Sequence, residues 1–211
     1  MDDLLWMLLG YVVLPLWLLA GVVDYWTHQR TSIALTAGPR ESRLHLVQTL
    51  QVGIPVLIVL FLELNLFALA LLVAGAVAHT LTAYWDVRYA SGRREILPLE
   101  QLAHAFLFTL PLFATVLLVI MHWPAVHTPT GLASSGAGDW GLALRDPAWP
   151  TSVVTTVLLA SFVFGLLPAL AEFWQVRRVY RREVRRLDTA PGPAHGRPPG
   201  PAHGEAVRPV G

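Results

Sequence analysis

Five apolar stretches, each about 20 residues long, constrain the fold of this chain more than any other feature of its sequence. At a rise of about 1.5 Å per residue, a helix of that length crosses the ~30 Å hydrocarbon core of a bilayer and satisfies its own backbone hydrogen bonds there. The composition agrees, because 55% of the 211 residues are hydrophobic and 14% are charged, too little polar surface to coat a soluble domain. We therefore predict an all-α, polytopic membrane helical bundle of about five transmembrane helices, with the lipid bilayer as its solvent.

Proline, glycine and polar residues mark the ends of these helices. We expect helices at residues 4–29, 39–64, 67–89, 98–121 and 151–175, with a basic helical continuation after the last one. The bundle then occupies residues 1–187, and its Gly-, Ser- and Pro-rich segment at 124–150 is predicted to be an extracytoplasmic loop. Residues 188–211 are rich in Pro, Gly and His and cannot bury a core, so we predict a disordered cytoplasmic tail.

The arginines predict the orientation of the chain. All 15 basic residues are arginines, and most follow the first, third and fifth predicted helices, which end on the same side of a membrane. Cytoplasmic segments carry an excess of basic residues, so we expect the N-terminus outside and the C-terminus in the cytoplasm of a bacterial-type inner (plasma) membrane. A net charge of +1, spread over helix ends rather than one soluble face, indicates no nucleic-acid partner.

Four of the predicted helices each carry one histidine and one carboxylate near the same end. The pairs are Asp24/His28, Glu41/His45, His79/Asp86 and Glu100/His104. Spacings of four or seven residues place both members of a pair on one helix face. Alternating helices bring the four pairs to similar depth near the inner membrane boundary, where titratable side chains are costly and normally face the interior of the bundle. We therefore expect the pairs to converge.

So many imidazoles and carboxylates suit two metal ions, whose positive charge offsets the repulsion between the acids. The candidate metal ligands are His79, Glu41, His45, Glu100, His104, Asp86, Asp24 and His28. His79 is the strongest candidate because it lies deepest in an apolar run, whereas Asp24, His28 and Asp86 could instead orient ligating imidazoles. Imidazole and carboxylate donors without cysteine suit iron, manganese or zinc, and of these we expect iron. Haem is disfavoured, because each histidine has a companion carboxylate and haem pockets are mostly apolar.

The pattern resembles the di-iron and di-manganese carboxylate bundles, in which acids and histidines project inward from four helices. The resemblance is architectural and covers residues 24–104. Those bundles use Glu-x-x-His, whereas this chain has Glu41-Ser-Arg-Leu-His45 and Glu100-Gln-Leu-Ala-His104, each one residue longer. The resemblance implies a membrane-embedded non-haem iron oxidoreductase or hydroxylase near the cytoplasmic face. Its partners would be a lipid-like or hydrophobic small-molecule substrate and an electron-donor protein.

Other functions fit the same residues. The acids could form ion pairs at the headgroup level with nearby arginines, namely Arg30, Arg40, Arg43, Arg88 and Arg94. The chain would then be a non-catalytic membrane metal-binding, metal-handling or accessory protein. Zinc in place of iron would make it a zinc-dependent membrane hydrolase. Glu172, near the cytoplasmic end of the last helix, is expected to pair with an arginine.

Overall fold

The structure is a computed structural model of the chain, and it describes residues 2–123 and 141–189. Over these ranges it is helical and contains no strand. The elements are α1 (Asp2–Leu8), the π-helical η1 (Leu9–Val13), α2 (Leu14–Arg30), α3 (Ile33–Thr36), α4 (Pro39–Phe61), α5 (Leu66–Ser91), α6 (Pro98–Met121), α9 (Thr151–Ala160), the π-helical η2 (Ser161–Leu166) and α10 (Leu167–Thr189).

Five helical segments are long and apolar enough to cross a membrane. They are Asp2–Arg30, Pro39–Phe61, Leu66–Ser91, Pro98–Met121 and Thr151–Thr189. Large apolar side chains such as Leu57, Val77 and Phe113 lie exposed on the outer faces of these segments, as expected where the solvent is hydrocarbon rather than water. The predicted all-helical architecture with five apolar helices is therefore confirmed.

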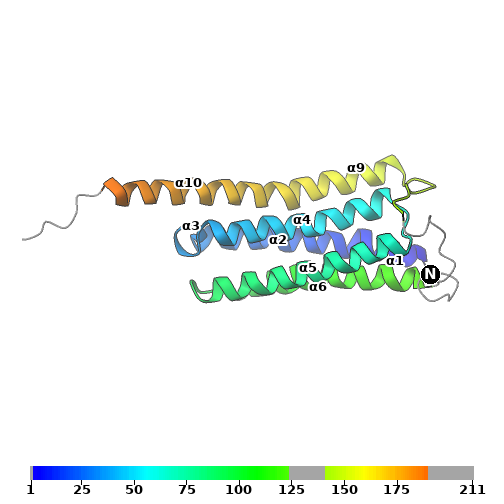
Figure 1. Cartoon of the computed structure of the whole chain (residues 1–211), viewed down its shortest axis with the longest axis horizontal. Coiled ribbons are helices and arrows are strands. Elements are labelled where there is room, and N and C mark those ends of the chain that lie inside the picture. The colour runs from blue at the N-terminus through cyan, green and yellow to red at the C-terminus, as the bar shows by residue number, and fades with distance from the viewer. Residues whose placement is uncertain (1, 124–140, 190–211) are drawn as a thin grey trace, which may run out of the picture.

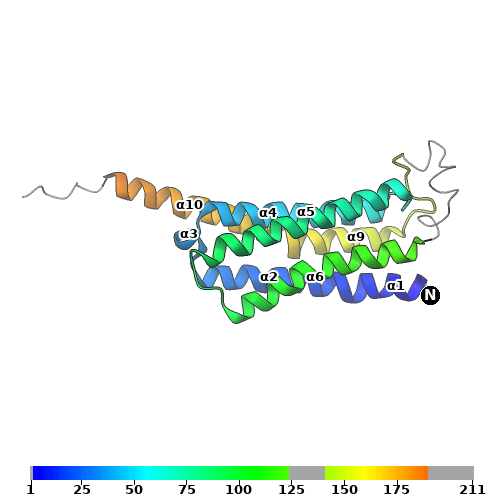
Figure 2. The same cartoon turned by 60° about the horizontal axis from the view of Figure 1, so that its bottom comes forward.

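The long helices run side by side in one bundle (Figures 1 and 2). α4 packs against α5 and α10, α2 packs against α6, and α5 also packs against α6. The last segment, α9 to α10, thus belongs to the bundle, and the end of α10 projects beyond the other helices on the side where α3 lies (Figure 1). All five segments consequently line one interior.

Local sequence signals account for most helix ends. Proline occupies the first turn of α4 and of α6, where its missing N–H costs no hydrogen bond. The side chain of Asn65 caps α5 by accepting a hydrogen bond from the backbone N–H of Ala68 at 2.9 Å. α4 ends at Phe61, before the predicted residue 64, because the chain there turns extended and pairs with residues 143–145. Leu62 forms an isolated antiparallel bridge with Leu144, which the hydrophobic pattern could not reveal.

The two ends of the bundle interior differ in polarity. One end is an apolar core built from α4, α5 and α6, with buried residues Ile58, Leu64, Ala68, Leu69, Leu72 and Leu118. The other end, where α2 and α5 finish and α4 and α6 begin, buries charged and histidine side chains. The basic continuation of α10 is helical through Thr189, and the rest of the predicted tail, like residues 124–140 of the predicted loop, lies outside the described residues.

Candidate metal centre

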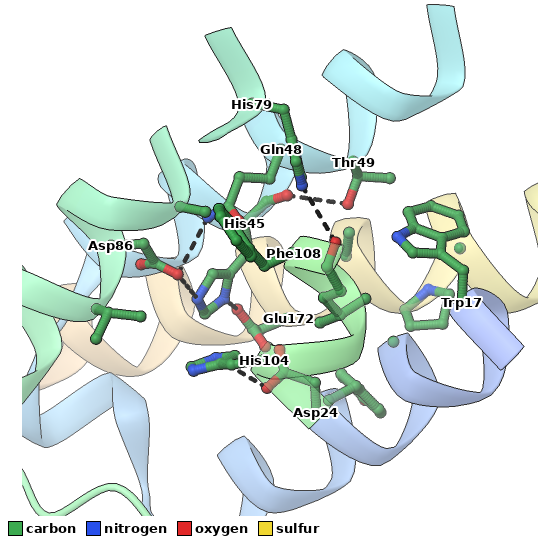
Figure 3. Close-up of a pocket in the computed structure, with 18 of the residues that line it drawn as sticks. Trp17, Asp24, His45, Gln48, Thr49, His79, Asp86, His104, Phe108 and Glu172 are labelled. Atoms are coloured by element: carbon green, nitrogen blue, oxygen red, sulfur yellow. Dashed lines mark hydrogen bonds and ion pairs between the residues drawn. The ribbon is translucent and has the colours of Figure 1, made fainter. Parts of the chain in front are cut away.

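Acidic and histidine side chains from five helices meet inside the bundle at its polar end (Figure 3). We call this set the His/carboxylate cluster: Asp24 and His28 from α2, Glu41 and His45 from α4, Asp86 from α5, Glu100 and His104 from α6, and Glu172 from α10. His28, Glu41 and Glu100 have 0% exposed surface. Seven of the eight predicted ligands are thus brought together, joined by one acid from the fifth segment.

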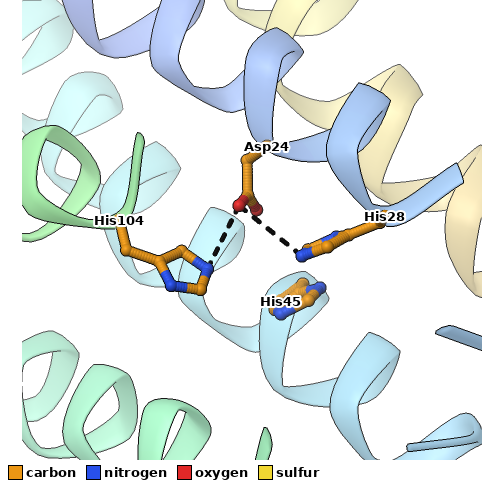
Figure 4. A group of neighbouring side chains, drawn as sticks. All are labelled: Asp24, His28, His45 and His104. Atoms are coloured by element: carbon orange, nitrogen blue, oxygen red, sulfur yellow. Dashed lines mark ion pairs between the residues drawn. The ribbon is translucent and has the colours of Figure 1, made fainter. Parts of the chain in front are cut away.

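Three overlapping groups within the cluster could hold a metal ion. The groups are Asp24/His28/His45/His104, His28/Glu41/Glu100 and Glu41/His45/Asp86, and the possible ligand atoms in each lie within 4.8 Å of one another. Figure 4 shows the first group. His28, Glu41 and His45 each belong to two groups, so the three groups form one continuous site rather than separate ones.

Glu172 bridges two of the imidazoles. Its Oε2 lies 2.7 Å from Nδ1 of His28, and its Oε1 lies 2.7 Å from Nδ1 of His45. The two rings stack with centroids 4.5 Å apart and planes 7° from parallel. An ionised carboxylate only accepts, so in neutral imidazoles the protons lie on Nδ1 and the lone pairs on Nε2, the arrangement found in carboxylate–histidine–metal sites.

The role of Glu172 corrects a prediction from the sequence. It contacts two histidines and not an arginine, because α10 packs against α4 and α2 and turns this acid into the bundle. The signal for this position is that Glu172 is a carboxylate in an otherwise apolar transmembrane run, a placement that favours an inward-facing side chain.

The Nε2 atoms of the three cluster histidines crowd against carboxylate oxygens. The closest approaches are His28 to Glu100 at 3.2 Å and to Asp24 at 3.5 Å, His104 to Asp24 at 3.1 Å, and His45 to Asp86 at 3.0 Å. These Nε2 atoms are nevertheless buried without a hydrogen-bond partner in the described part of the chain. Either a proton on Nε2 or a coordinated cation would satisfy this arrangement.

Arg94, in the connection between α5 and α6, neutralises two of the acids. Its Nη2 donates to both Glu41 and Glu100, and its Nη1 donates to the second oxygen of Glu100 at 2.9 Å. Burial alone would lower the pKa of Arg94, but these hydrogen bonds outweigh burial and raise it, so the guanidinium stays charged. Arg94 is one of the five arginines predicted from the sequence as possible partners of the acids, and the exposed Arg93 beside it is not.

The other arginines near the cluster have different contacts. Arg30 lies over the ring of Trp26 at 3.8 Å, and Arg40 and Arg93 lie over the ring of Tyr89 at 4.9 and 3.7 Å. Among the ion pairs of the described residues, Arg94 is the arginine that reaches the cluster. The alternative in which arginines neutralise all the acids therefore holds for Glu41 and Glu100 only.

The formal charge of the site is strongly negative. Five carboxylates and one guanidinium, with neutral imidazoles, leave a charge of −4 in the bundle interior. Buried uncompensated charge is costly, so the site must either take up protons or bind cations. Two divalent cations would balance this charge.

His79 lies outside the three groups. Its Nε2 lies 3.3 Å from the carbonyl oxygen of Leu107, and its ring is buried with 4% exposure. Asp86, two helical turns further along the same face of α5, does reach the cluster and accepts a hydrogen bond from Gln48 Nε2 at 3.1 Å. The depth of His79 in an apolar run, which made it the leading sequence candidate, therefore reflects burial beside a backbone carbonyl.

A cavity of about 550 Å³ adjoins the cluster (Figure 3). Asp24, Asp86, His104 and Glu172 are part of its wall, and much of the remainder is apolar, including Leu107, Phe108 and Phe164. Leu81 and Tyr84 also line it and are 58% and 59% exposed, so the cavity reaches the lateral surface of the bundle beside α5. An apolar molecule in the bilayer could enter here without crossing water.

In comparisons with family models, curated proteins and solved structures, nothing matches this chain.

Proposed function

We propose that this protein is a membrane-embedded metalloenzyme whose His/carboxylate cluster binds two iron ions and oxidises a lipid-like substrate. The observation that carries the proposal is the set of buried Nε2 atoms that lie 3.0–3.5 Å from carboxylate oxygens without a well-aligned hydrogen bond. Atoms so placed attract each other only when a proton or a metal cation lies between them, and the proposal assigns a metal cation to this position.

Two ions fit better than one. Two divalent cations would balance the formal charge of −4 that the site has when its imidazoles are neutral, and the three ligand groups share His28, Glu41 and His45. Three imidazoles and four carboxylates make up these groups, which is similar in donor type to the di-iron carboxylate bundles. Nitrogen and oxygen donors without sulfur suit iron, manganese or zinc.

Iron would supply redox chemistry with dioxygen. In a hydroxylation, one oxygen atom of O₂ goes to a substrate carbon and the other leaves as water, with two electrons and two protons that an electron-donor protein must provide. The chain itself would hold the ligands and exclude water: Glu172 keeps two imidazoles in one tautomer, and the apolar cavity beside the cluster takes the substrate. The cavity's apolar wall and lateral opening support a substrate drawn from the bilayer.

Metal analysis of the purified protein tests this proposal. We expect about two irons per chain, and loss of metal in His28→Ala, because His28 belongs to two ligand groups. His122→Ala is the matched control, since His122 lies at the far end of α6 and contacts a backbone carbonyl. A metal-free protein whose thermal stability is the same with and without a chelator would refute the proposal.

The same preparation separates the alternatives. Stoichiometric zinc instead of iron would indicate a hydrolase. An oxidoreductase should consume oxygen when given a reductant and a long-chain lipid, whereas a metal-handling protein should load and release its ion reversibly without oxygen uptake. One ion per chain would contradict the two-metal site while leaving the first ligand group, around Asp24, as a single-metal site.

A further inference from the structure

A second cavity, of about 670 Å³, occupies the other half of the bundle. Its wall is formed mainly by apolar side chains of α1, η1, α4, α5, α6 and α9, among them Leu9, Val52 and Leu118. Trp17 and His79 line this cavity and also the cavity beside the cluster. The two cavities therefore adjoin at these two side chains, one at the apolar end of the bundle and the other beside the His/carboxylate cluster.

The length of the second cavity matches one leaflet of a bilayer. Trp6 and Trp17 both line it, and at 1.5 Å per residue their positions on the first helical segment are about 16 Å apart. Half of the ~30 Å hydrocarbon core is about 15 Å, which is the depth that one extended acyl chain fills in each leaflet. Met7 and Tyr11 line the cavity and are 56% and 78% exposed, so it also opens to the lateral surface.

Hydrogen-bond acceptors are placed where the cavities meet. The carbonyl of Leu107 can only accept, and the backbone carbonyl of Gln48 also lies beside the ring, so neutral His79 can donate to one of them and leaves one acceptor without a donor. Nδ1 of His79 and Oε1 of Gln51, which lines the second cavity, are buried without a hydrogen-bond partner in the part of the chain that the structure describes. Two unused acceptors in an apolar passage favour a ligand that brings a donor, such as a hydroxyl group.

We propose that the two adjacent cavities together bind one unbranched lipid chain that carries a hydroxyl-bearing head. The tail lies in the second cavity and the hydroxyl at His79. The head then lies beside the cluster, in the first cavity. This inference rests on the proposed function, because it names the substrate class of that site. Three observations support it: the two cavities share lining residues, the second cavity is about as long as one leaflet is deep, and buried acceptors beside the cavities have no hydrogen-bond partner among the described residues.

Photo-crosslinking with a defined probe tests this inference. The probe is a saturated primary alcohol of about 16 carbons, close to one leaflet in length, with a diazirine at the far end of the chain. We expect crosslinks at residues of the second cavity, such as Met7 and Leu110, when the full-length protein is irradiated in lipid nanodiscs. Unlabelled alcohol of the same length should compete about tenfold better than the alkane, which lacks the hydroxyl hydrogen bond.

Two variants and one matched control sharpen the result. Ala114→Phe adds a ring in the second cavity and should abolish the crosslinks, whereas Ala70→Phe, the matched control on the exposed face of α5, should not. His79→Leu should remove the preference for the alcohol over the alkane. If Ala114→Phe does not fold, the competition between alcohol and alkane on the unaltered protein tests the inference instead.

The outcomes distinguish this inference from the proposed function. Crosslinks spread over lipid-facing residues, or equal competition by an alcohol of about 8 carbons, would overturn the inference. Metal content is measured in the same preparation. Two irons without cavity crosslinks would refute the lipid site alone, and cavity crosslinks in a protein that binds no metal would refute the metalloenzyme.

Discussion

Replacing Glu172 with glutamine tests whether this acid prepares two imidazoles for metal binding. The carboxylate accepts a hydrogen bond from Nδ1 of His28 and one from Nδ1 of His45, both at 2.7 Å. A glutamine amide of the same shape can accept only one of them, because its NH₂ group donates. The imidazole that faces the NH₂ must offer a bare Nδ1, so its proton moves to Nε2 and blocks that ligand atom.

The size of the effect follows from this loss of one prepared ligand. Removing the carboxylate that orients a metal-bound histidine lowers metal affinity by about 10- to 100-fold, equivalent to about 1.4–2.8 kcal/mol. The side chain is buried with 3% exposure, so water cannot take over as the acceptor without opening the bundle. We expect Glu172→Gln to fall within this range while the fold is retained, since the shape of the side chain hardly changes.

Competition against a chelator of known affinity measures the change. The matched control is Glu183→Gln on the same helix, an acid whose side chain is 43% exposed and forms a 3.9 Å ion pair with Arg186. The control should leave metal affinity unchanged. If Glu172→Gln binds metal as tightly as the unaltered protein and the control, Glu172 does not set the tautomers, and the stacked imidazoles have another function.

Two further predictions concern stability. Arg94→Met leaves the buried carboxylates of Glu41 and Glu100 without their guanidinium, so it should destabilise the metal-free protein by about 3–5 kcal/mol. Adding metal should restore part of this stability. The measurement is thermal unfolding followed by circular dichroism, and Arg88→Met, at an exposed position, is the control. Equal melting temperatures for these two variants would contradict the role of Arg94. Gly38→Ala should cost about 1–3 kcal/mol, because Gly38 has φ 72° and ψ −164°, which side-chain-bearing residues rarely adopt. Gly92→Ala, at φ −85°, is the control and should melt close to the unaltered protein, and a Gly38→Ala variant that melts at the same temperature would contradict the strain at Gly38.

The proposed site explains why the bundle buries charge at one end and not at the other. The apolar end packs Leu69 and Leu72 in the ordinary way of helix interfaces. The polar end places five carboxylates and one guanidinium among five helices, and cations or protons on the imidazoles must balance their charge. The proposed two-metal site would supply this balance with cations.

The fold follows largely from local sequence. The number of helices, their prolines at the first turn and the basic continuation of α10 depend on hydrophobic length and on residue type, so they could be predicted from the chain alone. Boundaries such as the end of α4 at Phe61 could not, because they depend on pairing with residues 143–145, about 80 residues away in sequence.

The candidate site also has features that the sequence predicts and features that depend on the tertiary structure. The sequence by itself determined that Glu41 and His45, or Glu100 and His104, share a helix face, because helical periodicity is a local property. Only the tertiary structure decided that Glu172 bridges two histidines and that Arg94 holds two acids. It also decided that His79 turns toward a carbonyl of α6. Those contacts depend on how each helix is rotated and on which helices are neighbours, and packing between distant segments sets both.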